Sequence, residues 1–398
     1  MGRRWVRDVV LFLSGQTVSL FGSSLVQYAI LWHLTLTTKS GVVLMLASVF
    51  GFLPQAVISI FGGVLADRHN RKLLIIAADA SIAAATLVLA VLLSRGDQSL
   101  WLIYAALAIR SVGAGVQGPA VAALLPQLAP TDRLMRINGI NASIQSGTML
   151  LAPAVAAWLY AVFALQAVLF VDVVTALIGI GLLVAIPVSR IQRDGPDIGY
   201  LDDLRGGLAY VRSHRVVRRV LAFFAILFFL VVPPSYLTPL MVARTFGGEV
   251  WKLTALELAF SVGMIVGGIV LAAWGGLRNR MTTMVATSVA LGVLSIGLGL
   301  SPGLWTFLAI MLAVGIAVAF FSTTTQTLLQ EQVEPEMQGR VFGVMGIVMA
   351  LAMPAGMMVF GPLGDVMSIE ALLIVSGGLA VAVGLAAGRR APAAIAAD

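Results

Sequence analysis

Residues 41–93 read GVVLMLASVFGFLPQAVISIFGGVLADRHNRKLLIIAADASIAAATLVLAVLL, and this stretch decides the fold. It holds two apolar runs, 41–63 and 73–93, joined by the charged loop VLADRHNRK. Each run reaches the roughly 20 apolar residues that a helix needs to cross the hydrocarbon core of a bilayer, which is about 30 Å thick. The stretch therefore predicts two membrane-spanning helices with a short charged loop between them.

The rest of the chain repeats this alternation of long apolar runs and short charged loops. Of its 398 residues, 60% are hydrophobic and 11% are charged, and the mean hydropathy is +1.00. Because soluble domains carry about 25% charged residues, this composition excludes a water-soluble fold. We predict an all-α membrane protein with twelve transmembrane helices, at 9–34, 41–63, 73–93, 100–124, 139–161, 166–187, 220–243, 253–274, 281–300, 304–328, 341–361 and 371–387.

The basic residues predict the orientation of these helices. If the N-terminus lies inside the cell, most of the 25 Lys and Arg residues fall in inner loops. The outer loops then hold only Lys39, Arg95, Arg244 and Lys252. Since cytoplasmic loops carry an excess of Lys and Arg, we expect both termini in the cytoplasm and a multi-pass protein of a bacterial inner membrane. The net charge of +7 then reflects topology, and no nucleic-acid partner is expected.

A polar segment, 189–219, divides the chain near its middle. It carries Leu201, Leu204, Leu208 and Val211 at helical spacing, which predicts an amphipathic helix on the inner membrane face. We therefore expect an N-terminal six-helix bundle at 1–188, a cytoplasmic linker at 189–219 and a C-terminal six-helix bundle at 220–398. The linker either lets the two bundles rock or only tethers them through contacts with anionic lipid.

The two halves also resemble each other in sequence. Gly62-Gly63 followed by Asn70-Arg71 recurs as Gly275-Gly276 followed by Asn279-Arg280. In the same order, Pro130, Arg136, Gly139 and Pro153 recur as Pro335, Arg340, Gly343 and Pro354. Such repeats predict two pseudo-symmetric bundles, and repeat-built transporters bind their substrate at the repeat interface near the bilayer midplane.

Enzymatic and metal chemistry is not indicated. The chain has no cysteine and three histidines, and these are not clustered. A membrane-embedded lipid-modifying enzyme would need a positioned nucleophile, base or metal constellation, and the sequence supplies none. We therefore expect no catalytic residue, no metal and no cofactor.

The loop of the opening stretch, Gly63 to Lys72, resembles the signature G-x-L-A-D-R-x-G-R-K of the major facilitator superfamily. Its physics is readable directly: a glycine lets helices pack closely, Asp67 can sit at a helix N-terminus, and the cations stay on the inner face. Asn70 replaces the family's glycine, and because asparagine is one of the few residues that tolerate a left-handed turn conformation, the departure is mild. The resemblance implies a conformational latch that holds the inner ends of the two halves in the outward-open state. Its residues would be Gly63, Asp67, Arg68, Arg71 and Lys72, with a second-half loop at Glu331, Gly339 and Arg340.

Among major facilitators, the chain is most similar to bacterial macrolide-efflux proteins, the third group of drug:proton antiporters. The similarity lies in Gly51-Phe52-Leu53-Pro54, Ile109-Arg110-Ser111 and Gly339-Arg340-Val341-Phe342. It implies a monomeric secondary transporter, set among membrane lipids, that exports small amphipathic drugs of the macrolide kind by alternating access in exchange for protons. The alternative is an exporter of siderophores or lipid-like metabolites with the same fold. The fifth-span antiporter signature has lost most of its glycines, so transport is better supported than antiport.

Four ionisable residues fall inside predicted spans, where each costs about 2.5–3.5 kcal/mol and marks a functional candidate: Asp79, Arg110, Asp172 and Glu257. Arg110 resembles the fourth-span motif R-x-x-Q-G of proton-coupled exporters. Since arginine does not titrate, it either controls the protonation of a nearby carboxylate or forms a fixed structural ion pair. Glu257 is our preferred proton carrier, with Asp79 and Asp172 as alternatives.

Spans one and five each carry a stripe of polar residues, which includes Gln27 in span one and Gln145 in span five. Gln117 lies on the same helical face as Arg110. These three glutamines are candidates for lining a substrate cavity. Helix packing through hydrogen bonds is the competing explanation for such stripes. Pro233-Pro234 predicts a break in span seven, and Gly263 with Gly267 predicts close helix packing in span eight.

Overall fold

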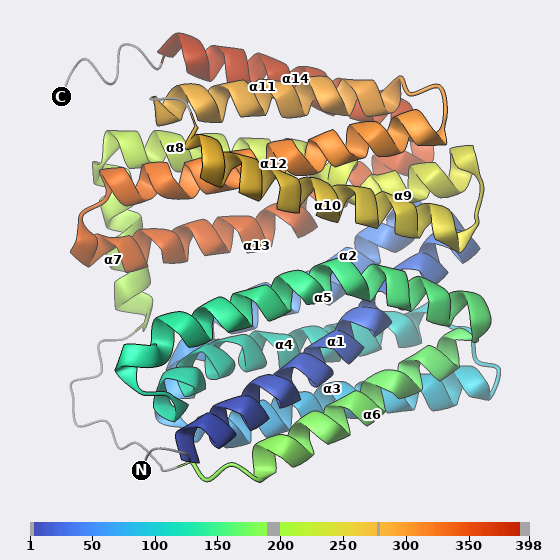
Figure 1. The fold of residues 1–398 in the computed structure, drawn as a ribbon. Coiled ribbons are helices and arrows are strands. Elements are labelled where there is room, and N and C mark those ends of the chain that lie inside the picture. The colour runs from blue at the N-terminus through green and yellow to red at the C-terminus, as the bar shows by residue number, and fades with distance from the viewer. Residues whose placement is uncertain (1–3, 189–199, 277–278, 391–398) are drawn as a thin grey trace. The chain divides into compact units, whose positions relative to one another are not determined.

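The computed structural model describes residues 4–188, 200–276 and 279–390 (Figure 1). In this part of the chain all regular structure is helical. The helices are α1 (Arg4–Thr38), α2 (Gly41–Arg68), α3 (Arg71–Ser94), α4 (Leu100–Leu128), η1 (Thr131–Arg133), α5 (Leu134–Val162), α6 (Leu165–Val184), α7 (Tyr200–Ser213), α8 (Arg215–Leu230), η2 (Pro233–Leu237), α9 (Thr238–Met241), η3 (Val242–Phe246), α10 (Val250–Trp274), α11 (Arg280–Gly299), α12 (Leu304–Gln332), α13 (Pro335–Val366) and α14 (Ile369–Arg390).

Twelve helical segments of the described chain are long and apolar enough to cross a membrane, which confirms the predicted number of spans and the all-α class. The seventh of them, Arg215–Phe246, is assembled from α8, η2, α9 and η3 in succession. Several helices run beyond the predicted spans. For example, α13 begins at Pro335, where a proline at the first helical position needs no hydrogen-bond acceptor for its nitrogen.

The chain forms two compact units. Unit 1 comprises Met1–His33 and Leu46–Tyr200, and unit 2 comprises Leu34–Met45 and Leu201–Asp398. The end of α1 and the start of α2 therefore group with unit 2. The predicted division, in contrast, assigns all residues up to 188 to the N-terminal bundle. On the predicted linker, the structure has the helix α7, in which Val211 is buried and Leu208 is exposed.

Within unit 1, α3 packs against both α4 and α6 (Figure 1). At one end of the unit, a hydrophobic cluster joins side chains from six helices, including Phe12 of α1, Ile75 of α3 and Leu124 of α4. Close helix contact is also made by small residues, because a Cβ added to Gly179 would lie 2.9 Å from the carbonyl oxygen of Gly15. These contacts fix the helices that carry the buried polar residues described below.

Within unit 2, α10 crosses α12 and α11 packs along α14. At the first crossing, a Cβ added to Gly263 would lie 2.1 Å from the carbonyl oxygen of Leu312. A Cβ added to Gly267 would lie 2.8 Å from that of Ile316. The predicted close packing at Gly263 and Gly267 is therefore confirmed, and the crossing needs both positions to lack a side chain.

Gly263→Ala is expected to destabilise the protein by about 1–3 kcal/mol, because the added methyl group overlaps backbone that cannot move away. Gly268→Ala is the matched control: no atom lies within 4 Å of a Cβ at that position. The measurement is the unfolding free energy of both variants in mixed detergent micelles. Equal stability of Gly263→Ala and the wild type would contradict the packing at this crossing.

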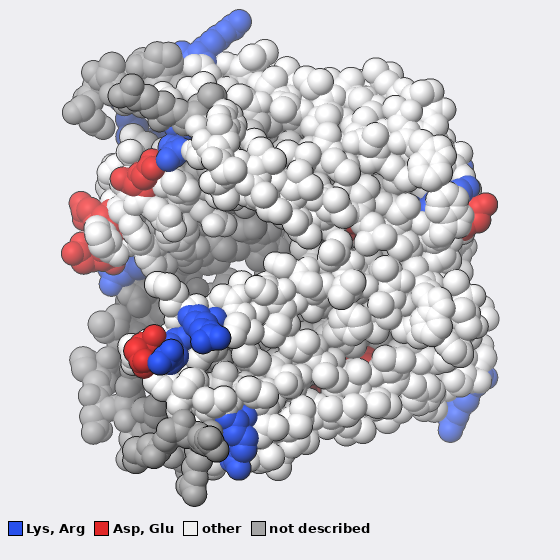
Figure 2. Space-filling model, in the orientation of Figure 1, with Lys and Arg blue, Asp and Glu red and all other residues white. Residues whose placement is uncertain are grey.

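Tryptophans mark the ends of the spans. Trp101, Trp251 and Trp305 are exposed near the first residues of α4, α10 and α12, and Trp158 and Trp274 are exposed near helix ends. Figure 2 shows Lys, Arg, Asp and Glu gathered toward the helix ends on the visible face, with an almost uncharged band between them. Aromatic belts and charges outside an apolar band are the pattern of a protein embedded in a bilayer.

Candidate functional site

A buried ion pair lies inside unit 1. The guanidinium of Arg110, on α4, donates to Asp172 of α6 and to Thr86 of α3. Asp172 is fully buried, and it also accepts a hydrogen bond of 2.8 Å from the hydroxyl of Ser23, on α1. Arg110 is 6% exposed and reaches the carbonyl of Ser23 at 3.2 Å. Four helices thus converge on one charge pair, which resides in the interior of the unit and not at its surface.

Asp79, on α3, lies close enough to Asp172 for the two carboxylates to interact electrostatically. Its Oδ1 accepts from the amide of Gln117, on α4, and from the hydroxyl of Ser19 at 3.5 Å. Its Oδ2 is buried and has no hydrogen-bond partner, and the Oε1 of Gln16 is in the same condition. Of the two aspartates, Asp79 is thus the one whose hydrogen bonding is incomplete.

The charges of this cluster do not balance when both carboxylates are ionised. Arg110 neutralises Asp172, which leaves the charge of Asp79 uncompensated in a place that is 2% exposed. A buried, unpaired charge is far more costly than the neutral form of the same group. A proton on Asp79 would make the cluster electrically neutral without disturbing the Arg110–Asp172 pair.

The polar stripe of span one supplies two hydroxyls of this cluster. Ser19 and Ser23 stand one helical turn apart on α1 and reach Asp79 and Asp172, respectively. Farther along α1, Gln27 is half-buried beside Gly51 of α2. The stripe thus packs helices at Ser19 and Ser23, as expected for intramembrane hydrogen bonds.

The three glutamines proposed for a cavity occupy different environments. Gln117 is buried, and its amide is used by Asp79. Gln145, on α5, is exposed. The amide groups of Gln27 and Gln145 are therefore still available to bind a ligand, whereas Gln117 belongs to the charged cluster.

Glu257 lies on α10, in unit 2. It is half-buried and forms no ion pair or hydrogen bond with another described side chain. The phenol of Tyr236, on η2, is close enough to interact with it electrostatically. α8 ends at Leu230 and the π-helical turn η2 begins at Pro233, so the predicted break in span seven is confirmed. This break carries the tyrosine that faces the carboxylate.

Two cations of the charged loop 64–72 donate hydrogen bonds to the C-terminal ends of three helices in unit 1. Arg71 donates to the carbonyls of Ala66 (3.0 Å) and Ala123 (2.8 Å), at the ends of α2 and α4. The ammonium of Lys72 donates to the carbonyls of Val184 (2.8 Å) and Ile186 (2.7 Å), at the end of α6. Cations stabilise helix C-termini, where carbonyls lack partners and the helix dipole is negative.

The structure places two residues of this loop differently from what the motif suggests. Asn70 does not adopt a left-handed conformation: it is extended, with φ −65° and ψ 109°, and its side chain accepts from the N–H groups of Lys72 and Leu73 as the N-cap of α3. Asparagine suits this position because it satisfies donors that the first helical turn leaves free. Asp67 lies in the last turn of α2 and not at the N-terminus of that helix. The surroundings of Gly63 and of the Asp67 side chain lie outside what the structure describes, and Arg68 is exposed.

The corresponding loop of unit 2 repeats this geometry. Asn279 caps α11 by accepting from the residues two and three positions on, at 3.0 and 3.3 Å, the same distances as at Asn70. Arg280 donates to the carbonyl of Gly275, five residues earlier, as Arg71 does to Ala66. Arg280 also pairs with Glu331 at 3.4 Å. The internal repeat read from the sequence therefore extends to individual hydrogen bonds.

Arg340 and Gly339 lie in the first turns of α13. A Cβ added to Gly207, on α7, would lie 2.9 Å from the carbonyl oxygen of Arg340, so α7 packs closely on this backbone. Gly339 is exposed, and no atom lies within 4 Å of a Cβ added to it. Of these two residues, only Arg340 is thus part of a close contact.

Sequence reasoning missed a charged contact at the opposite end of α2. Asp365, near the end of α13, accepts from the N–H groups of Gly41 (2.6 Å) and Val42 (2.9 Å) and from the hydroxyl of Ser40 (2.7 Å). Arg244 pairs with Asp365 at 2.7 Å and also donates to the carbonyl of Lys39. All six residues belong to unit 2. The predicted spans 220–243 and 341–361 end before Arg244 and Asp365, so neither residue is among the predicted site residues.

Asp365→Ala is expected to destabilise the start of α2 by about 1–2 kcal/mol, because the first N–H groups of the helix lose their acceptor. Hydrogen exchange of the peptide that contains Gly41 and Val42 should quicken accordingly. Glu370→Ala is the control. It removes a carboxylate in the first turn of α14, close in sequence to Asp365, whose hydrogen-bond partner in the described part of the chain is Thr245. Unchanged exchange in Asp365→Ala would show that Asp365 does not hold the helix.

The described residues contain no group of three or more His, Cys, Asp or Glu that could hold a metal ion. What the site does contain is a set of ionisable side chains inside membrane-spanning helices, in a chain with repeated halves. These are the features of a secondary transporter. The chain belongs to the Major Facilitator Superfamily, whose family model matches residues 12–357.

Two macrolide efflux proteins match over most of the chain. Macrolide efflux protein A of Streptococcus pyogenes is 33% identical over 388 residues, covering 96% of this chain and 95% of the relative. Macrolide efflux protein A of Enterococcus faecalis is 34% identical over 314 residues, covering 78% of this chain and 97% of the relative. The family predicted from the loop motif is therefore confirmed.

Solved structures show the same fold. A POT family transporter in complex with 5-aminolevulinic acid gives a TM-score of 0.75 at 12% identity, covering 97% of this chain and 96% of that chain. The nucleoside transporter NupG gives a TM-score of 0.72 at 14% identity, covering 96% and 99%. At these identities the likeness concerns the fold alone.

Proposed function

We propose that this major facilitator exports small amphipathic drugs of the macrolide kind from a bacterial cell, in exchange for protons and by alternating access. The observation that carries the proposal is the likeness to Macrolide efflux protein A of Streptococcus pyogenes over 96% of the chain. The proposal includes an inner-membrane location, cytoplasmic termini and a monomeric transporter. The excess of basic residues in alternate loops supports this orientation.

Proton coupling needs a carboxylate that can gain and lose a proton inside the membrane. Asp172 suits this task least, because its two carboxylate oxygens already accept from Arg110, Thr86 and Ser23. Glu257 remains the preferred carrier, since it has no cationic partner among the described residues and is only half-buried. Asp79, with its free oxygen, is the second candidate. In this proposal Arg110 stays paired with Asp172, and this pair contributes to the electrostatic potential at Asp79.

Alternating access needs contacts that form in one state and break in another. The loop that contains Asp67 is proposed as the latch of the inner ends, a role that rests on its family resemblance. Arg71 and Lys72 support the latch indirectly, because they hold the loop against the ends of α2, α4 and α6.

Flux measurements on purified protein test the function. In proteoliposomes, a radiolabelled macrolide should accumulate only when a pH gradient is imposed, and a protonophore should abolish the accumulation. Empty liposomes and liposomes with an unrelated major facilitator serve as controls for passive partition of the drug. Accumulation that ignores the pH gradient would contradict proton exchange, and absence of any protein-dependent flux would contradict macrolide export.

A further inference from the structure

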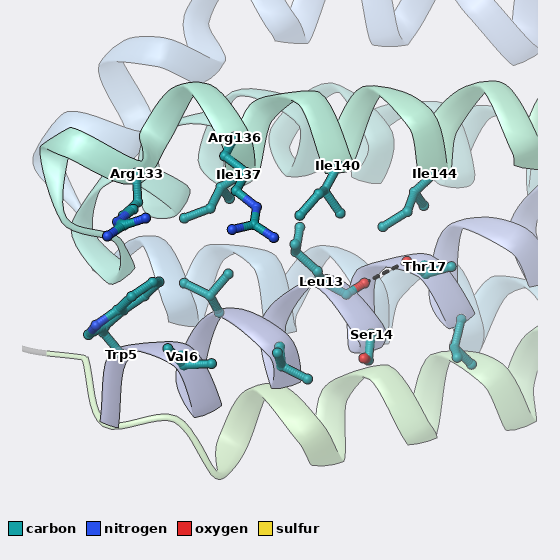
Figure 3. A pocket seen from close by; sticks show the side chains of 13 residues that line it. Trp5, Val6, Leu13, Ser14, Thr17, Arg133, Arg136, Ile137, Ile140 and Ile144 are labelled. Carbon is teal, nitrogen blue, oxygen red and sulfur yellow. Dashed lines mark hydrogen bonds between the residues drawn. The ribbon is translucent and has the colours of Figure 1, made fainter. Parts of the chain in front are cut away.

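A cavity of about 760 Å³ lies between α1 and the start of α5 in unit 1. Figure 3 shows its two walls: Trp5 and Val6 on α1 face Arg133 and Arg136, and farther along Leu13 and Thr17 face Ile140 and Ile144. The cavity belongs to neither the charged cluster around Arg110 nor the surroundings of Glu257. It has a charged end and an apolar body.

The body of the cavity suits a hydrocarbon chain. Its floor includes the buried side chains of Val9, Leu13 and Ile137, and its rim includes the exposed side chains of Val10 and Ile140. The hydroxyl of Thr17 is already used, since it donates to the carbonyl of Leu13 at 2.6 Å. Along α1 the lining extends from Trp5 to Val18, which is about 20 Å at 1.5 Å per residue. One leaflet of the hydrocarbon core is about 15 Å thick, so the cavity has the length of an acyl chain.

The charged end suits an anion. Arg136 is exposed and has no carboxylate within 4.0 Å among the described residues. Arg133 pairs with Asp132 at 3.1 Å, but both side chains are more than half exposed, and such pairs hold weakly. Two guanidinium groups in a planar fork geometry match the oxygens of a phosphate. A cationic amphiphile, in contrast, would be repelled at this end.

We propose that this cavity binds one acidic phospholipid, with its phosphate on Arg136 and Arg133 and one acyl chain along Val10, Leu13 and Ile140. Charge complementarity and leaflet-scale length both favour this occupant over a drug. The site also has the position expected for such a lipid, because basic pockets between transmembrane helices bind anionic headgroups. Trp5 lies beside the arginines, as aromatic side chains do at the level of the headgroups.

Native mass spectrometry of the purified full chain tests the proposal, with titration by phosphatidylglycerol or phosphatidylcholine. We expect wild-type protein to prefer phosphatidylglycerol. Each of Arg133→Gln and Arg136→Gln should weaken its binding roughly fivefold, and the double variant roughly 25-fold. Arg95→Gln is the matched control. It also removes one arginine charge, but Arg95 is the C-cap residue of α3 and does not line the cavity. Ile140→Trp keeps both arginines but fills the groove, and should weaken phosphatidylglycerol binding as well.

Three outcomes would overturn the proposal. Binding that is unchanged in the Arg133→Gln/Arg136→Gln double variant would exclude the headgroup site. Binding that is unchanged in Ile140→Trp, or displaced equally well by glycerol phosphate, would exclude the acyl chain and leave only a surface anion site. Displacement of phosphatidylglycerol by a macrolide at stoichiometric concentration, still seen when both arginines are removed, would assign the cavity to the drug.

Discussion

Asp172→Asn is expected to lower the unfolding free energy of the protein by about 3–5 kcal/mol, because it leaves Arg110 as a buried charge without a counter-ion. Asp172 is fully buried and accepts hydrogen bonds from Arg110, Thr86 and Ser23. An asparagine retains one acceptor oxygen but places an amide N–H₂ group opposite a hydroxyl or a guanidinium. The measurement is reversible unfolding in mixed micelles, or loss of secondary structure on heating.

Asp79→Asn is the matched control for this prediction. It removes a carboxylate from the same cluster, on the neighbouring helix α3, but Arg110 keeps its partner. The asparagine oxygen can still accept from Gln117 and Ser19, and the Oδ2 that is replaced has no partner to lose. We therefore expect a change below about 1 kcal/mol, the size of an ordinary intramembrane hydrogen bond. Equal stability of both variants would contradict a charged Arg110–Asp172 pair.

Arg110→Lys refines the same argument. The charge is kept, yet a single ammonium cannot reach Asp172, Thr86 and the carbonyl of Ser23 together, as the guanidinium does. The stability of this variant should fall between those of the wild type and Asp172→Asn. Such an order would show that both the charge and the planar fork contribute.

Much of this fold could be predicted from the sequence, because the bilayer imposes length and composition on each span. The twelve apolar runs and the repeat of Asn70-Arg71 as Asn279-Arg280 are local patterns, and the structure repeats even their hydrogen bonds. The sequence does not decide the conformation of Asn70, because asparagine serves both left-handed turns and N-caps. Which of these two conformations Asn70 adopts depends on where the first turn of α3 begins.

Partners distant in the sequence could not be predicted. Arg110 had three possible carboxylates, and helical spacing on α4 alone does not say that α6 supplies the one that pairs with it. Asp365 contacts Gly41 across 324 positions, and no periodicity links them. Its signal in the sequence is an acidic residue beside a glycine at a span end, which also describes an ordinary loop. Tertiary packing, not local pattern, assigns these contacts.

Glu257→Gln is expected to abolish the coupling of drug export to the pH gradient, because glutamine mimics the protonated acid and cannot release a proton. In proteoliposomes, addition of drug should drive proton movement with wild-type protein and cause none with this variant. Downhill movement of the drug should continue, since glutamine preserves the shape of the side chain. Glu257 has no ion pair among the described residues, so the substitution leaves no buried partner charge behind and the fold should be unaffected.

The variants Asp172→Asn and Asp79→Asn test whether Glu257 or an aspartate carries the proton. Asp172→Asn is compared only if enough folded protein is recovered, whereas Asp79→Asn should fold and insert normally. If Glu257→Gln keeps full coupling and Asp79→Asn loses it, the proton is carried in unit 1, where the unpaired Oδ2 of Asp79 offers a site for it. If both variants keep full coupling, these carboxylates do not carry protons, and export must be driven by another ion or run downhill. If coupling is lost in both variants, proton transfer requires both Glu257 and Asp79, and neither carboxylate is sufficient by itself.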